Sequence, residues 1–507
     1  MSLKRNILVS YASQIYITLV GIIMLPLYLK YMGAEAYGLV GFFTMLQAWF
    51  NLLDMGLTPT VARETARFRG GDTDAVSYRR LLRALQLIFF VVALLGGGAM
   101  FLCSGLIAQG WLKMQILPLA QVQLALQLMA VGVALRWMSG LFRGCISGSE
   151  RLVWLGGFNA FVATLRFVGV LPVLLWVGHS PAIFFTYQLL VAVVELGGLA
   201  AKAYGLFPAV PPAQKLGWSP ASLFKPIQPL LRFSLTIAFT SSVWVLVTQT
   251  DKLILSGILP LAEYGYFTLA VLVAGGITII SGPISMAIMP RMARLHAEGN
   301  HDEVRRIYNQ AAQLVSVIAG SLAVTLIVCT ESLLFAWTGN RAVTDAAAPI
   351  LRLYAIGNGL LALGAFPYYL QYARGNLRYH LIGNLLLVVL LTPAIIVAAM
   401  KAGGVGAGWV WVSMNALYLV FWVGYVHSKL EPGLHWNWLV SNVFIILLPT
   451  LLVGLVFSRL QPDVHSRALE FVHVAVITSA CMLVATMASP ILRPAVLQAV
   501  RGRLSWG

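Results

Sequence analysis

Charged side chains interrupt the long apolar stretches of this sequence at a few positions. Arg136 and Arg166 are the clearest cases, and Lys252 and Arg352 lie in similar surroundings. A charged group inside an apolar span is costly, so it marks a functional site by default. Arginine donates a fork of N–H groups to phosphate or carboxylate and keeps its charge at any physiological pH. We predict that Arg166, Arg136, Lys252 and Arg352 bind an anionic substrate, although Lys252 and Arg352 lie close enough to span ends to reach lipid headgroups instead.

Acidic residues form a second set within the apolar stretches. Asp54, Asp251 and Glu195 are candidates for coupling transport to H+ or Na+. A structural bond between Asp54 and a loop arginine is the alternative for that residue. Asp251 and Lys252 are neighbours, so on a helix they point about 100° apart and their pairing is not assumed.

Sequence motifs of enzymes and metal sites do not occur in the chain. There is no HExxH, GxxxxGK[ST] or GxSxG, and neither the eight histidines nor the four cysteines have metal-ligand spacing. The glycine-rich run 403–408 follows no predicted strand, so it indicates close helix packing or a hinge instead of a nucleotide loop. We therefore predict no catalytic residue, no metal and no cofactor, and transport driven by an ion gradient or by the substrate gradient.

The composition excludes a soluble globular protein. The chain has 507 residues, of which 59% are hydrophobic and 10% are charged, against about 25% charged residues in soluble domains. The net charge of +17 comes from short basic clusters between apolar runs. Binding to nucleic acid needs a solvated basic surface, so we expect no nucleic-acid partner.

The apolar runs predict an all-α polytopic membrane protein, because each is close to the roughly 20 residues that cross a bilayer as a helix. Most lysines and arginines fall in the even-numbered loops and at both ends of the chain, which places both termini in the cytoplasm. The sequence predicts about fourteen spans, near 7–30, 36–57, 84–107, 116–142, 152–177, 181–203, 231–257, 263–290, 311–336, 348–372, 379–401, 404–427, 437–459 and 468–491.

Matching motifs indicate an internal repeat of six helices. Glu35-Ala36-Tyr37-Gly38 corresponds to Glu263-Tyr264-Gly265, and Pro59-x-x-Ala62-Arg63 corresponds to Pro290-x-x-Ala293-Arg294. An even number of helices per copy gives parallel repeats related by an axis along the membrane normal. The expected organisation is a six-helix lobe at 1–205, a cytoplasmic connector at 206–230, a second six-helix lobe at 231–428, and two additional helices with a tail at 429–507.

Several short motifs resemble the polysaccharide-transporter (Wzx-like) flippases of the multidrug/oligosaccharidyl-lipid/polysaccharide exporter superfamily. They are Pro26-Leu27-Tyr28-Leu29, Gly33-x-x-x-Tyr37-Gly38, Asn51-Leu52-Leu53-Asp54-Met55-Gly56-Leu57, Ala62-Arg63-Glu64 and Gln249-Thr250-Asp251-Lys252-Leu253-Ile254-Leu255. The resemblance covers most of the chain and implies a MATE-like fold of two six-helix lobes that form a V.

The resemblance also implies a function. The substrate would be an undecaprenyl-pyrophosphate-linked oligosaccharide for O-antigen, capsule or exopolysaccharide, moved from the cytoplasmic to the periplasmic face by alternating access through a cationic cavity. The protein would lie in the bacterial inner membrane. Its partners would be membrane lipid, a polysaccharide polymerase and a chain-length regulator. Alternatives are an ion-coupled MATE-like drug or small-solute antiporter, and a lipid II flippase, which resembles this chain in span number. A membrane glycosyltransferase or polymerase and a non-transporting scaffold are less favoured.

The predicted orientation has a direct test with fusion reporters in a bacterial host. Green fluorescent protein fused after Gly507 should fluoresce, and alkaline phosphatase fused there should be inactive, because the basic loops hold this end in the cytoplasm. Alkaline phosphatase inserted after Lys113 should be active. An active phosphatase at Gly507 would contradict the orientation.

Overall fold

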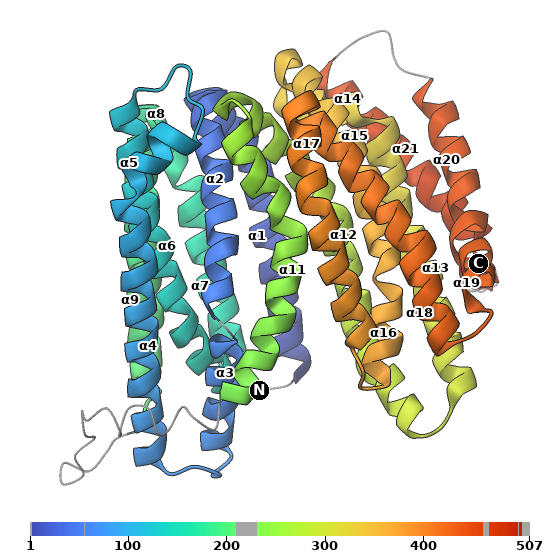
Figure 1. Cartoon of the computed structure of the whole chain (residues 1–507), viewed down its shortest axis with the longest axis horizontal. Helices are drawn as coiled ribbons and strands as arrows, with labels where there is room; N and C mark the ends of the chain where they lie inside the picture. The colour runs from blue at the N-terminus through green and yellow to red at the C-terminus, as the bar shows by residue number, and fades with distance from the viewer. Residues whose placement is uncertain (1–2, 55, 209–230, 460–465, 495, 499–507) are drawn as a thin grey trace, which may run out of the picture. The chain divides into compact units, whose positions relative to one another are not determined.

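The computed structural model describes residues 3–54, 56–208, 231–459, 466–494 and 496–498 of the chain (Figure 1). This part of the chain is helical and contains no β-strand, only an isolated bridge between Lys113 and Pro260. The all-α fold class is therefore confirmed. Most of the predicted connector 206–230 lies outside the described residues.

Long apolar helices dominate the described chain. Twelve of its helical segments are long and apolar enough to cross a membrane, which confirms a multi-pass membrane protein. One of them, Arg378–Leu430, has 53 residues, and Ala402 and Gly403 interrupt its helical backbone, Gly403 with φ of 56°. The 28-residue helix α11 (Leu231–Ile258) is not among the twelve. The count of fourteen spans stays a prediction.

The chain divides into two compact units, Met1–Gly265 and Tyr266–Gly507. The first holds α1 (Leu3–Met32), α2 (Ala34–Phe50), α3 (Leu57–Arg69), α4 (Ala75–Leu102), α6 (Leu119–Gly148), α7 (Leu152–Ala163), α8 (Val170–Trp176), α9 (Pro181–Tyr204), α11 and the start of α12 (Leu261–Ala297). The second holds the rest of α12, α13 (His301–Val328), α14 (Thr330–Thr338), α15 (Arg341–Gly364), α16 (Phe366–Ala373), α17 (Arg378–Leu417), α18 (Val423–Leu430), α19 (Leu434–Trp438), α20 (Ile445–Ser458) and α21 (Arg467–Ala488). Short or π-helical turns, η1 (Asn51–Asp54), α5 (Ser104–Leu106), η2 (Ile107–Trp111), η3 (Thr164–Val168), η5 (Tyr418–Trp422) and η6 (Leu439–Phe444), join several of these helices.

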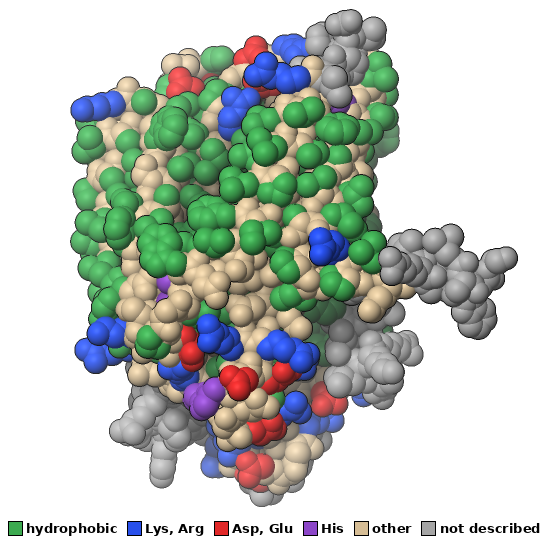
Figure 2. Space-filling model, turned by 90° about the vertical axis from the view of Figure 1, so that its right-hand side faces the viewer, with side chains coloured by type: hydrophobic (Ala, Val, Ile, Leu, Met, Phe, Trp, Pro, Cys, Tyr) green, Lys and Arg blue, Asp and Glu red, His purple; other side chains and the backbone are tan. Residues whose placement is uncertain are grey.

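Apolar side chains face outward over much of the surface, as expected where lipid is the solvent. Val389, Leu452 and Leu483 are examples that are exposed despite being apolar. Figure 2 shows apolar side chains over the middle of one face, with charged side chains gathered mainly toward its two ends. This distribution fits a protein surrounded by a bilayer.

Helix α6 is the central element of the first unit and packs against α3, α4 and α9. One of its faces carries Gly140, Gly144 and Gly148, spaced four residues apart. A Cβ atom added to Gly144 would lie 2.8 Å from the carbonyl oxygen of Thr58 on α3. Glycine at these positions lets the two backbones approach closely, as in packed transmembrane helices.

The first turns of α2 and α12 meet at the two matching motifs of the predicted repeat. A Cβ atom on Gly265 would lie 2.7 Å from the carbonyl oxygen of Ala34, and one on Gly38 would lie still closer to that of Leu261, so the two helix turns need glycine at both positions. Beside this crossing, the buried carboxylate of Glu35 accepts backbone N–H groups at 2.5, 2.9 and 2.9 Å from Gln115, Ile116 and Leu117. The carboxylate thus fixes the loop before α6, and the repeat itself stays a prediction.

The glycine face of α6 gives a stability prediction. Gly144→Ala should lower the free energy of unfolding by about 1–3 kcal/mol, because the new methyl group overpacks the contact with α3. Gly132→Ala on the same helix is the matched control, since nothing lies within 4 Å of its would-be Cβ atom. Thermal unfolding of the two detergent-solubilised variants compares them, and equal melting temperatures would contradict the proposed packing.

Candidate functional site

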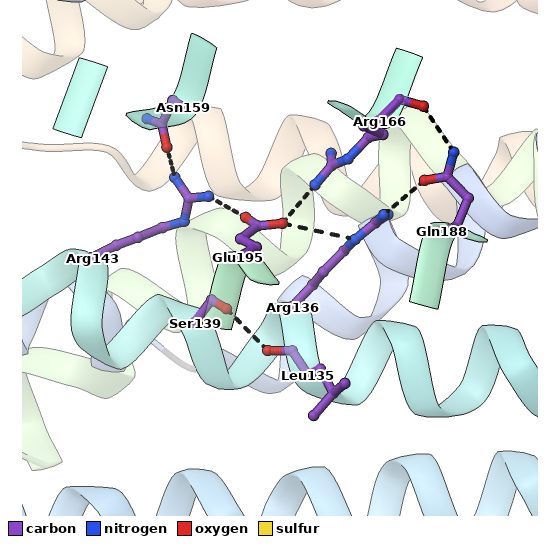
Figure 3. Close-up of polar contacts among 8 residues, drawn as sticks. All are labelled: Leu135, Arg136, Ser139, Arg143, Asn159, Arg166, Gln188 and Glu195. Atoms are coloured by element: carbon purple, nitrogen blue, oxygen red, sulfur yellow. Dashed lines mark hydrogen bonds and ion pairs between the residues drawn. The ribbon is translucent and has the colours of Figure 1, made fainter. Parts of the chain in front are cut away.

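Three arginine side chains converge on one buried carboxylate in the first unit (Figure 3). Glu195 is 3% exposed. Its Oε2 atom accepts a hydrogen bond from Arg166 Nη2 at 2.7 Å and lies 4.0 Å from Arg136 Nε, and its Oε1 atom accepts one from Arg143 Nη2. We call Arg136, Arg143, Arg166 and Glu195 the arginine cluster.

Two neutral amides complete the arrangement. Arg143 Nη1 donates to Asn159 Oδ1 at 2.6 Å, and Arg136 Nη2 donates to Gln188 Oε1 at 3.0 Å. Each contributing segment thus carries two of these polar residues: α6 carries 136 and 143, α7 with η3 carries 159 and 166, and α9 carries 188 and 195. A separation of seven residues is close to two helical turns, so both members of each pair face the same side of their helix.

A local change of helix type positions Arg166. The turn Thr164–Val168 is a π-helix between α7 and α8, in which the Gly169 N–H bonds to the Thr164 carbonyl at 3.0 Å. Side chains from α1 and α9 donate to the three carbonyls that follow: Tyr187 Oη to Leu165 at 2.9 Å, Gln188 Nε2 to Arg166 at 3.0 Å, and Tyr28 Oη to Phe167 at 2.7 Å. Single π-turns of this kind are frequent at functional sites. These three donors fix the turn from which Arg166 reaches Glu195.

The cluster has more donors than acceptors. Three guanidinium groups offer about fifteen N–H groups, since each has five, whereas the hydrogen bonds above use four of them. In the described part of the chain, the Nε atoms of Arg136 and Arg166 are buried without a hydrogen-bond partner. Three cations and one anion leave a net charge of +2. The arginine cluster is therefore suited to hold an additional anion with several oxygen atoms.

Part of the cluster remains accessible. The side chain of Arg143 is 32% exposed, and that of Arg166 is 25% exposed. The side chain of Arg136 is only 9% exposed, and its guanidinium group lies 5.1 Å from the centre of the Phe43 ring. A ligand can therefore approach Arg143 and Arg166, while Arg136 supplies positive charge from behind them.

The structure brings together three of the seven residues predicted from the sequence: Arg136, Arg166 and Glu195. Asp54 lies at the end of η1, where its carboxylate accepts hydrogen bonds from Thr58 N (3.2 Å) and Thr58 Oγ1 (2.6 Å). This structural bond is to the first turn of α3 and not to a loop arginine, the partner expected from the sequence.

The remaining predicted residues make other contacts. Asp251 and Lys252 do pair, at 3.3 Å, because the flexible lysine side chain folds back along α11 and also donates to the Thr248 carbonyl at 2.5 Å. Arg352, in the second unit, is exposed and pairs with Glu331 at 3.3 Å. A role of Lys252 and Arg352 in substrate binding, and of Asp54 and Asp251 in ion coupling, stays a prediction.

Sequence reasoning missed Arg143, Asn159 and Gln188. Arg143 was assigned to a loop after the fourth predicted span, whereas α6 extends to Gly148 and keeps Arg143 within the helix. A usable signal was the spacing of seven residues that links Arg143 to Arg136, Asn159 to Arg166 and Gln188 to Glu195.

Comparisons with known proteins agree on one family of folds. The family model described as "Polysaccharide biosynthesis protein" matches residues 3–296. No curated protein matches the chain significantly. Among solved structures, the chain is similar to "Lipid II flippase MurJ, inward closed conformation" with a TM-score of 0.71 and 14% identity over 95% of this chain and 98% of that one. It is also similar to an inward-facing multidrug resistance MATE family transporter of the MOP superfamily, with a TM-score of 0.64 and 15% identity over 83% of this chain and 96% of that one. At these identities the likeness shows the fold, which is that of MOP superfamily transporters.

The link between Gln188 and the arginine cluster is testable by substitution. Gln188→Leu should lower the free energy of unfolding by about 1–3 kcal/mol, because the Arg166 carbonyl and the Arg136 side chain each lose a buried partner. Thr186→Val on the same helix is the control, expected within about 0.5 kcal/mol of the wild type, because its exposed hydroxyl donates to the Ala182 carbonyl within α9 itself. Chemical or thermal unfolding in detergent measures both, and a Gln188→Leu variant as stable as the control would contradict this assignment.

Proposed function

Because the chain belongs to the polysaccharide biosynthesis protein family, we propose that it is a transporter of a lipid-linked oligosaccharide in a bacterial inner membrane. The substrate is an undecaprenyl-pyrophosphate-linked unit of O-antigen, capsule or exopolysaccharide, and it moves from the cytoplasmic to the periplasmic face. Both termini lie in the cytoplasm. The multi-pass helical fold, shared with MOP superfamily transporters, supports a transporter rather than an enzyme.

The observation that carries this proposal is the surplus of guanidinium donors in the arginine cluster. A diphosphate diester carries two negative charges and several oxygens, which matches the net charge of +2 and the guanidinium N–H groups of Arg143 and Arg166 that the hydrogen bonds described above do not use. Guanidinium groups bind phosphate oxygens in two-point fashion. The side chains of Glu195 and Arg136 are 4% and 9% exposed, so the attraction at this depth is stronger than on an open surface.

The division of the substrate follows from the same physical constraints. The charged diphosphate and the sugar need polar contacts, which the partly exposed side chains of Arg143 and Arg166 offer. The polyprenyl chain is as apolar as the lipid tails and stays among them. Similar folds are described as inward closed and inward-facing, which supports alternating access as the means of moving the headgroup, with H+ or Na+ as candidate coupling ions.

A lipid II flippase is the second candidate function. The structure with a TM-score of 0.71 carries that description, and a lipid-linked diphosphate would fit the arginine cluster equally well. Export of cationic drugs is less favoured, because a net positive site repels cations. The type of lipid-linked sugar that accumulates when the gene is deleted distinguishes the two flippase functions. A polysaccharide polymerase and a chain-length regulator are the proposed partners of the oligosaccharide transporter.

Substitution of Arg166, a partly exposed member of the arginine cluster, tests the proposed function in cells. Arg166→Ala should reduce surface glycan by about tenfold or more while the amount of protein stays near normal, because one charge-assisted phosphate contact is lost. The undecaprenyl-linked oligosaccharide should accumulate on the cytoplasmic face, measured by extraction and by labelling of each membrane face.

Arg294→Ala is the matched control for this experiment. It also removes one positive charge, but the Arg294 side chain is 69% exposed and pairs with Glu298 on the surface. Normal surface glycan in both variants would contradict the proposed function.

A further inference from the structure

Glu195 occupies the point at which an anionic ligand of the arginine cluster would be expected. Its two carboxylate oxygens are divided between Arg143 on one side and Arg166 on the other. Its side chain is 4% exposed, whereas those of the two arginines are 32% and 25% exposed. The carboxylate is thus more deeply buried than the two arginine side chains with which it pairs.

We propose that Glu195 is an internal counter-ion that the substrate's diphosphate displaces and that returns to the arginines when the substrate leaves. This inference rests on the proposed function, since it assumes that the arginine cluster binds the diphosphate. It assigns Glu195 to the control of binding strength and of substrate release, in place of the ion-coupling role predicted from the sequence.

Repulsion among the three arginines explains why a counter-ion is needed. Three guanidinium groups from neighbouring helices would repel one another in an apolar environment, where uncompensated charges are costly. Glu195 lowers the charge of the cluster to +2 and bonds to two of its three arginines. The cluster can therefore stay assembled without substrate.

The same carboxylate limits how tightly the substrate binds. A diphosphate that reaches Arg143 and Arg166 competes with Glu195 for their N–H groups, so part of the binding energy is used to replace existing bonds. Transport requires binding that is favourable enough for entry and weak enough for release. The exchange keeps the empty and loaded sites close in free energy.

The neutral amides define which contacts can change. Asn159 holds Arg143 at 2.6 Å, Gln188 holds Arg136 at 3.0 Å, and Gln188 also binds the backbone of Arg166. The two amide side chains are neutral, so they do not cancel the positive charge that attracts a phosphate. They keep the guanidinium groups in place while Glu195 and the substrate exchange.

Binding of inorganic pyrophosphate to the purified full chain in nanodiscs, measured by titration calorimetry, tests the inference. Glu195→Gln should bind pyrophosphate at least about tenfold more tightly than the wild type, because a carboxylate beside a bound anion is strongly unfavourable. In cells the same variant should produce less surface glycan, since release becomes slow. Glu298→Gln, at an exposed carboxylate that also pairs with an arginine, should bind as the wild type does.

A second variant covers the case in which Glu195→Gln does not fold. The double substitution Glu195→Gln with Arg143→Gln removes both partners of one buried pair and keeps the net charge at +2, so it should be better tolerated. Its affinity for pyrophosphate should be at least about tenfold higher than that of the single Arg143→Gln variant, because both lack the Arg143 contact and only the double variant lacks the competing carboxylate.

The outcomes separate this inference from the proposed function. Suppose that the wild type binds pyrophosphate and the Arg166→Ala variant does not. A Glu195→Gln variant whose affinity for pyrophosphate is equal to or weaker than that of the wild type would then overturn the counter-ion role alone. A double variant that binds pyrophosphate no more tightly than the single Arg143→Gln variant would overturn it too. Wild type that fails to bind pyrophosphate, with no effect of Arg166→Ala, would overturn both the counter-ion role and the proposed function.

Discussion

The pairing of one buried carboxylate with three guanidinium groups is the interaction on which the first unit depends. Charges within apolar helices are costly unless they are paired and hydrogen-bonded. Glu195, Arg136, Arg143 and Arg166 come from three helical segments, so their compensation exists only when these segments are packed together. The requirement for pairing therefore ties helix packing to the chemistry of the site.

Two features of the backbone make that packing geometrically feasible. The glycine face of α6, with Gly144 at its centre, lets α3 pack closely, while other faces of the helix pack against α4 and α9. The π-turn Thr164–Val168 redirects the chain at Arg166, and side chains of α1 and α9 bind its carbonyls. Both features use local backbone geometry to place charged side chains, because a regular helix of bulky residues would hold the guanidinium groups elsewhere.

The charge balance of the arginine cluster also bears on how tightly an anion would bind there. A site that bound a diphosphate with every donor free would hold it too tightly, and a site without positive charge would not attract it. The arginine cluster lies within residues 3–296, the part of the chain that matches the polysaccharide biosynthesis protein family. Its net charge, its partly exposed arginine side chains and the amides that hold them all belong to one unit of the chain.

The sequence alone determined the membrane fold and the unusual residues, whereas only the tertiary structure decided which of them act together. Apolar runs of helical length predict spans because the thickness of the bilayer, and not a contact with a distant residue, sets the length that is needed. The cost of a charge within such a run marks Arg136, Arg166 and Glu195. Their convergence on Glu195 joins side chains that are 29 residues apart for Arg166 and 59 residues apart for Arg136, and it also recruits Arg143 from what the sequence indicated was a loop. Such contacts depend on how helices pack and where they end, which no local pattern specifies.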